Sequence, residues 1–206
     1  MSRKARFRPD HRRAAIANEA ARITQEQGIT DFRFAKEKAV ERLGLRNTGP
    51  LPSNAEIEAA LAERNRIFRG DQHLAHLRQA RAAAMAIMQT LQSFYPRLVG
   101  SVLSGHTTEH AAIQLHLFSD AVEAVGVRLD ALGINHRTVQ NRHRLRRGQV
   151  ERFPGYRFIA KEFDFATTVF PERSRRQAPL SPVDGRPMRR ANLRELARLV
   201  DGEPPT

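Results

Sequence analysis

The chain has no cysteine, only four lysines and no long uninterrupted run of apolar residues. Without cysteine it can form no disulfide, no zinc ribbon and no thiol nucleophile. No apolar run approaches the roughly 20 residues that a helix needs to cross a bilayer. The sequence also has no Gly-Lys pair, so it lacks a phosphate loop that ends in Gly-Lys-Ser or Gly-Lys-Thr. These absences exclude several enzyme classes and predict a protein that does not enter the membrane.

The first nine residues are basic, and Arg12 and Arg13 follow them where a secretory signal would have an apolar core. We therefore expect residues 1–9 to form a basic arm rather than a leader. A cytoplasmic location is the corresponding prediction.

Arginine supplies most of the positive charge. The 206 residues include 35 Lys and Arg against 22 Asp and Glu, which gives a formal net charge of +13 and a pI of about 11.4. A planar guanidinium binds phosphate through two parallel hydrogen bonds and stays charged when it is partly buried. The charge therefore favours a nucleotide or the phosphate backbone of RNA or DNA as partner, although a solvated basic surface would explain it equally well.

The first half of the chain has the apolar spacing of helices. We predict helices from Asp10 to a stop at Gly28, from a cap at Asp31 to Leu43, from a capping box at Ser53 and Glu56 to Gly70, and from a cap at Asp71 to a point before Pro96. The last of these should bury Leu74, Leu77, Ala84, Met85, Met88 and Leu91. The first two also resemble the start of a transcriptional repressor's DNA-binding head, so a DNA-binding regulator is one alternative function.

After Pro96 short apolar segments alternate in part with polar residues, a pattern typical of strands. We predict strands over 97–103, 112–118 and 137–147, a turn at Pro154-Gly155, and one or two strands within 156–170. A helix capped by Ser119 should end at Gly133, a proline-rich loop should span 173–187, and a last helix 190–200. The expected fold class is α/β of the α+β kind, with a helical N-terminal half and a small mixed sheet. The expected domains are 1–70, 71–172 and 173–206.

One stretch combines a strand, a turn and a spacing that carry functional information. Gly100-Ser101 follows Arg97-Leu98-Val99, Gly105 comes shortly after, and Ala112 begins the next apolar segment about ten residues on. With the helices before and after it, this stretch resembles the nucleotidyltransferase-fold superfamily, especially its small stand-alone bacterial members, over residues 72–170. The resemblance implies that the Gly-Ser turn holds nucleotide phosphates. It also implies that an acid-x-acid pair holds two metal ions for in-line transfer.

The two acid positions of that pattern hold Ala112 and Gln114. Alanine has no ligand atom and a glutamine carbonyl is uncharged, so neither replaces a metal-binding carboxylate. The third acid of the superfamily lies on a later strand, where Asp164 is the best match and the one candidate catalytic residue. We therefore expect a degenerate active site that binds a nucleotide, a nucleic acid or a protein partner. The alternative is an active nucleotidyltransferase that holds Mg²⁺ through Asp164 and other acids.

The remaining candidates are binding residues. The candidate nucleotide contacts are Gly100, Ser101, Gly105, Gln114 and His116. Ala112, Gln114 and His116 share one face of an extended strand, and that face either meets solvent or lines a retained pocket. The candidate nucleic-acid contacts are Arg137, Arg142 and Arg144, of which the last two share a strand face. His106, His110 and His116 lie near Glu109 and could hold a transition metal, but loop histidines are ordinarily solvated, and we assign no metal site.

Overall fold

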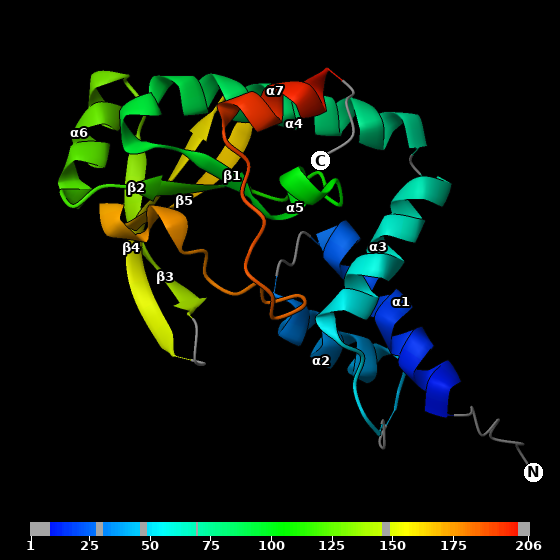
Figure 1. Cartoon of the computed structure of the whole chain (residues 1–206). Helices are drawn as coiled ribbons and strands as arrows, with labels where there is room; N and C mark the ends of the chain where they lie inside the picture. The colour runs from blue at the N-terminus through cyan, green and yellow to red at the C-terminus, as the bar shows by residue number, and fades with distance from the viewer. Residues whose placement is uncertain (1–8, 28–30, 46–48, 69, 146–148, 202–206) are drawn as a thin grey trace, which may run out of the picture. The chain divides into compact units, whose positions relative to one another are not determined.

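The computed structural model describes residues 9–27, 31–45, 49–68, 70–145 and 149–201. Over these ranges the chain forms seven α-helices and a five-stranded mixed sheet, with the helices concentrated in the first half (Figure 1). The fold class is therefore α+β, as predicted. The basic arm, apart from Pro9, and the helix stop at Gly28 lie outside the described residues. No helix within the described ranges combines the length and the apolar character that a bilayer crossing requires.

The chain divides into two compact units. Residues 1–71 and 108–110 form the first unit, and residues 72–107 and 111–206 form the second.

The first unit consists of α1 (Pro9–Gln27), α2 (Phe32–Arg42) and α3 (Asn54–Phe68). The predicted caps are confirmed. The Asp31 carboxylate accepts hydrogen bonds from the backbone N–H groups of Arg33 and Phe34, and Ser53 and Glu56 form a reciprocal capping box. The core of this unit is built largely from small side chains, which let the helices approach closely. Its fully buried members include Ile16, Ala20, Ile23, Ala35, Ala39 and Ile57.

The second unit begins in α4 (Gly70–Thr90), the longest helix. It starts at Gly70, so Asp71 lies in its first turn and not at the predicted cap. Leu77, Ala84, Met88 and Leu91 are buried as predicted and Met85 is half-buried, whereas Leu74 is 48% exposed. The prediction for Leu74 is wrong because α4 contributes to the core only from Leu77 onward.

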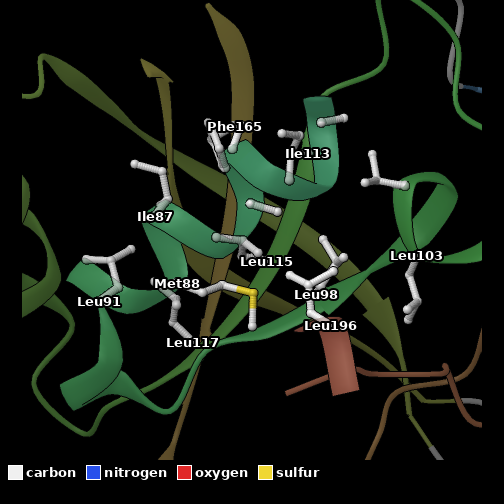
Figure 2. Close-up of a cluster of buried hydrophobic side chains, with 14 of the residues drawn as sticks. Ile87, Met88, Leu91, Leu98, Leu103, Ile113, Leu115, Leu117, Phe165 and Leu196 are labelled. Carbon is white, nitrogen blue, oxygen red and sulfur yellow. The ribbon is translucent and has the colours of Figure 1, made fainter. Parts of the chain in front are cut away.

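The sheet has the strand order β1-β2-β5-β4-β3. Its strands are β1 (Arg97–Val99), β2 (Ile113–Phe118), β3 (His136–Arg144), β4 (Val150–Ala160) and β5 (Phe163–Phe170). Strands β2 and β5 are parallel, and the other neighbours are antiparallel. One face of the sheet packs on α4, on α6 (Val122–Ala131) and on α7 (Leu193–Val200), and Figure 2 shows Met88 and Leu196 meeting the strand residues there.

Two strand predictions need correction. Strand β1 ends at Val99, and α5 (Gly100–Ser104) follows where a strand to Leu103 was predicted. A short apolar run fits a buried helix as well as a strand, and left-handed glycines bound this one, with φ of +73° at Gly100 and +86° at Gly105.

Strand β4 runs straight through Pro154-Gly155, where a turn was predicted. The regular pairing of β4 with β5 ends at Arg157 and Ala166, and Pro154-Gly155 lies just beyond that end. A Cβ on Gly155 would lie 1.9 Å from the carbonyl oxygen of Thr167, so only glycine permits this approach. The side-chain amide of Asn141 on β3 reaches across and donates to the same oxygen at 2.9 Å.

The ends of the later helices also differ from expectation. The cap of α6 is Ala121, and the Ser119 hydroxyl accepts the Ala121 N–H before the helix begins. The predicted loop contains a short 3-10 helix, η3 (Glu172–Arg176). Helix α7 begins only after Asn192, which forms a capping box with Glu195.

Candidate functional site

The Gly-Ser turn lies where β1 ends and α5 begins. Gly100 adopts a left-handed φ of +73°, which favours glycine. Strand pairing places Val99 beside Gln114 on β2, and a Cβ added to Gly100 would lie 2.7 Å from the Gln114 Oε1. The structure therefore brings Gly100 and Gln114 together. Glycine is favoured here both by the backbone angle and by the neighbouring side chain.

Helix α5 is fixed in place by side chains of α4. The Arg81 guanidinium donates to the carbonyl oxygens of Val102 at 3.2 Å and Leu103 at 3.3 Å, and His73 Nε2 donates to that of Gly105 at 2.9 Å. Burial lowers the pKa of Arg81. These contacts satisfy the carbonyl end of α5, so the Gly-Ser turn at its other end has a defined position.

Gln114 belongs to a row of residues that crosses the whole sheet on one face. The strand register pairs Gln114 with Ala166 on β5, Ala166 with Arg157 on β4, and Arg157 with Arg137 on β3. Directly paired residues point to the same face, and neighbouring strands lie about 4.8 Å apart. The Gln114 and Arg157 backbones are therefore about 10 Å apart, two strands away from each other. This distance suits a small phosphorylated ligand lying across the strands.

Asp164 lies on the same face, two residues before Ala166 on β5, and Ala112 lies just before β2. Its side chain is exposed and forms no ion pair with any side chain that the structure describes. Beside it on β4 lies Ile159, which is 71% exposed. Asp164 is thus an accessible carboxylate two residues along β5 from the row that contains Gln114.

No group of three or more His, Asp or Glu side chains in the described ranges is arranged to hold a metal ion. Of the histidine group considered from the sequence, His106 belongs to the second compact unit and His110 to the first. His116 is buried in β2, with 2% of its surface exposed.

Two pairs of arginines face each other directly across β3 and β4. Arg137 pairs with Arg157 in the row that contains Gln114, and Arg142 pairs with Arg152 on the opposite face. All four are exposed, and none forms an ion pair within the described part of the chain. Arg142 and Arg144 share a face, as strand alternation requires, but Arg137 lies on the other one.

Arg152 and Arg157 are candidates that sequence reasoning missed. Within β4 alone, nothing in the strand's own sequence marks either arginine as a binding residue. Only the register against β3 shows that each lies directly opposite another arginine. Like charges placed directly opposite across a sheet are destabilising, which makes the two pairs informative.

The end of the sheet face beyond Gln114 is covered. His116 contacts the rings of Phe170, at 4.8 Å between centroids, and His143, at 5.3 Å. Burial, followed by the positive charges of His143 and Arg190, holds the pKa of His116 well below its usual range. Its Nδ1 has no hydrogen-bond partner in the described structure. His116 is therefore a neutral core residue, and the accessible part of the face lies around Gln114, Asp164 and Arg157.

The cover over this end comes from residues 171–191. After β5 the chain forms η3, pairs Leu180 with Arg144 at the end of β3, and returns to pair Ala191 with Leu98 in β1. Figure 1 shows this segment, in orange to red, running along the sheet before it enters α7.

Comparisons of the chain with protein family models, with curated proteins and with solved structures find no match.

Proposed function

We propose that the accessible part of the sheet face binds a nucleotide through its phosphates, without catalysing metal-dependent nucleotidyl transfer. The observation that carries this proposal is the row in which Gln114, beside the Gly-Ser turn, shares one face with Arg157 and Arg137. The side-chain amide of Gln114, which lies against Gly100, supplies further N–H donors for a phosphate. The two guanidiniums supply charge-assisted hydrogen bonds to it.

The shortage of carboxylates around Gln114 argues against metal-dependent nucleotidyl transfer. A two-metal mechanism needs several carboxylates that grip both ions between the attacking and leaving oxygens. Asp164 offers one, while Ala112 and Gln114 offer no charge. Magnesium would be a cofactor only if transfer activity were retained. The arginines take over the neutralisation of phosphate charge that metal ions provide in an active enzyme.

Titration calorimetry with ATP, CTP, GTP and UTP, with and without Mg²⁺, tests the proposal. Replacing Arg157 with Gln should weaken nucleotide binding about 10-fold or more, the loss of one charge-assisted hydrogen bond. Arg152→Gln is the matched control, because it removes the same charge from the same strand on the opposite face. Absence of binding for all four nucleotides rejects the proposal, and so does an equal loss in both variants.

A transfer assay addresses the alternative reading. Mg²⁺-dependent incorporation of labelled nucleotide that disappears in Asp164→Ala would establish an active nucleotidyltransferase. We expect no incorporation above background with any of the four nucleotides.

The opposite face of the β3–β4 ribbon supports a second candidate function, contact with a nucleic-acid backbone. Arg142, Arg144 and Arg152 project there together, and Arg142 lies directly opposite Arg152. Each phosphate contact contributes about 0.9 to the slope of log K against log salt on duplex DNA. Combined Arg142→Gln and Arg144→Gln substitutions should reduce that slope by about 2. RNA or DNA binding with an unchanged slope in that variant would place the interface elsewhere.

A further inference from the structure

A second group of arginines gathers at the β1 edge of the sheet. Arg97 lies in β1, Arg175 in η3, and Arg190 immediately before Ala191. Ala191 joins β1 through two backbone hydrogen bonds with Leu98, of 2.8 and 2.9 Å. Arg175 and Arg190 therefore both belong to the segment 171–191, which returns to β1, where Arg97 lies.

The three side chains differ in how their donors are used. Arg190 donates to the carbonyl oxygens of Gln177 at 3.4 Å and Arg175 at 3.0 Å, so it holds the backbone of η3. Arg97 donates to the carbonyl oxygen of its neighbour Pro96 at 3.1 Å. The Arg175 guanidinium lies over the Tyr95 ring, 3.4 Å from its centre, and makes no hydrogen bond within the described residues. Stacking of this kind fixes a guanidinium while its in-plane N–H donors stay available.

The positive charges of this group are not balanced locally. Arg97 and Arg190 are partly buried, which lowers the pKa of both, and Arg190 experiences the charge of Arg97 while Arg97 experiences that of Arg175. Glu195 attracts Arg97, but its carboxylate also accepts the Asn192 N–H at 2.7 Å in the cap of α7. Within the described residues, Glu195 is therefore the carboxylate that acts on Arg97, and Arg175 and Arg190 form no ion pair. Partial burial of like charges costs free energy that a bound anion would offset.

We propose that Arg97, Arg175 and Arg190 form a binding site for a phosphate group, either inorganic phosphate or the phosphate of a small molecule. Arg97 and Arg175 contact the oxygens, and Arg190 is a positioning residue that holds the η3 backbone. None of the three belongs to the row that contains Gln114 and Arg157. This site therefore stands independently of the proposed nucleotide face.

Thermal unfolding at constant ionic strength, with inorganic phosphate replacing chloride, tests this site. Phosphate should raise the melting temperature of the wild-type chain, and Arg175→Gln should abolish that rise. Arg176→Gln is the matched control, since it removes the same charge from the next exposed residue of η3. Without phosphate, Arg175→Gln should melt at or above the wild-type temperature, because it relieves the repulsion of Arg97.

Three outcomes overturn the proposal. The first is a wild-type chain that phosphate stabilises no more than chloride does. The second is an Arg176→Gln variant that loses the phosphate effect as fully as Arg175→Gln. The third is an Arg175→Gln variant that melts well below Arg176→Gln without phosphate, which would make the stacked arginine a structural support. Arg97→Gln provides a second variant from a different element and should also lose the phosphate effect.

The source of the phosphate is resolved by comparing variants of the two sites. A nucleotide bound only at the arginine group loses its calorimetric signal in Arg175→Gln and keeps it in Arg157→Gln. Inorganic phosphate that stabilises the chain, with nucleotides unaffected by Arg175→Gln, assigns the site to the free ion. Loss of nucleotide binding in Arg157→Gln alone leaves the two sites separate, so either proposal can fail without the other.

Discussion

The wild-type chain should lose stability as the pH falls from 7.5 to 5.5, and replacing His116 with phenylalanine should make that loss smaller. The His116 ring is 2% exposed and lies against Phe170 and His143. Its pKa is held well below the usual 6.5 by burial and by the charges of His143 and Arg190. Phenylalanine has a similar shape and does not titrate.

The size of the effect follows from proton linkage. Above pH 7 the imidazole is neutral in both the folded and the unfolded chain, so stability does not depend on it. Below pH 6.5 the unfolded chain binds a proton that the folded chain excludes, and the free energy of unfolding falls. If the folded chain excludes the proton completely, the loss at pH 5.5 reaches its limit of about 1.4 kcal/mol. The pKa of His143 is also lowered by burial, so it adds a loss of the same sign that the variant retains.

Urea denaturation of both proteins at pH 7.5, 6.5 and 5.5 measures this loss. The fall in unfolding free energy between pH 7.5 and 5.5 should be smaller in His116→Phe by up to about 1.4 kcal/mol. At pH 7.5 the variant should be as stable as the wild type or more so, because it removes a buried Nδ1 that has no partner in the described structure. Equal losses in both proteins would refute the reasoning, since His116 would then titrate alike in the folded and unfolded chains.

Five further substitutions, single or combined, test the Gly-Ser region. Arg81→Met should lower the free energy of unfolding by about 2–3 kcal/mol in urea, because it leaves the carbonyls of Val102 and Leu103 without their charged donor. Gly100→Ala should cost about 1–2 kcal/mol in the same assay, through its left-handed backbone. Ala112→Asp combined with Gln114→Asp should create a Mn²⁺ site detectable by electron paramagnetic resonance. Adding Asp164→Ala should weaken Mn²⁺ binding at that site. An Mn²⁺ affinity that is unchanged by Asp164→Ala would show that the three positions do not converge.

Local chemistry made part of the fold predictable. The Asp31 cap and the Ser53–Glu56 capping box were predicted because all their partners lie within three residues. The stretch 100–104 was not, because an apolar run this short fits a strand and a buried helix alike. The turn predicted at Pro154-Gly155 was wrong for a different reason. Glycine also occurs inside a strand where a neighbouring backbone comes close, and only the contact with Thr167 distinguishes this case from a turn.

Of the candidate site, only the part on β2 could be predicted from the sequence. Strand alternation predicted that Gln114 and His116 share a face. It could not predict that His116 is buried while Gln114 stays half-exposed, because the cover comes from residues 171–191, far away in sequence. The same limit applied to Arg157, whose significance lies in its register against Arg137.

The pairing of Arg157 with Arg137 also provides a test between a binding surface and a basic surface that is only solvated. An arginine bias without function has no reason to set guanidiniums directly opposite each other, where repulsion costs about 0.2–1 kcal/mol per pair. Arg157→Gln should therefore make the free chain more stable by about that amount at low salt, while weakening nucleotide binding. Arg152→Gln should give the same gain, because it relieves Arg142, but should leave nucleotide affinity unchanged. In 1 M NaCl both gains should vanish, since the Debye length falls to about 3 Å. A loss of stability in Arg157→Gln at low salt would mean that Arg137 and Arg157 do not repel each other, and the solvated-surface explanation would then stand.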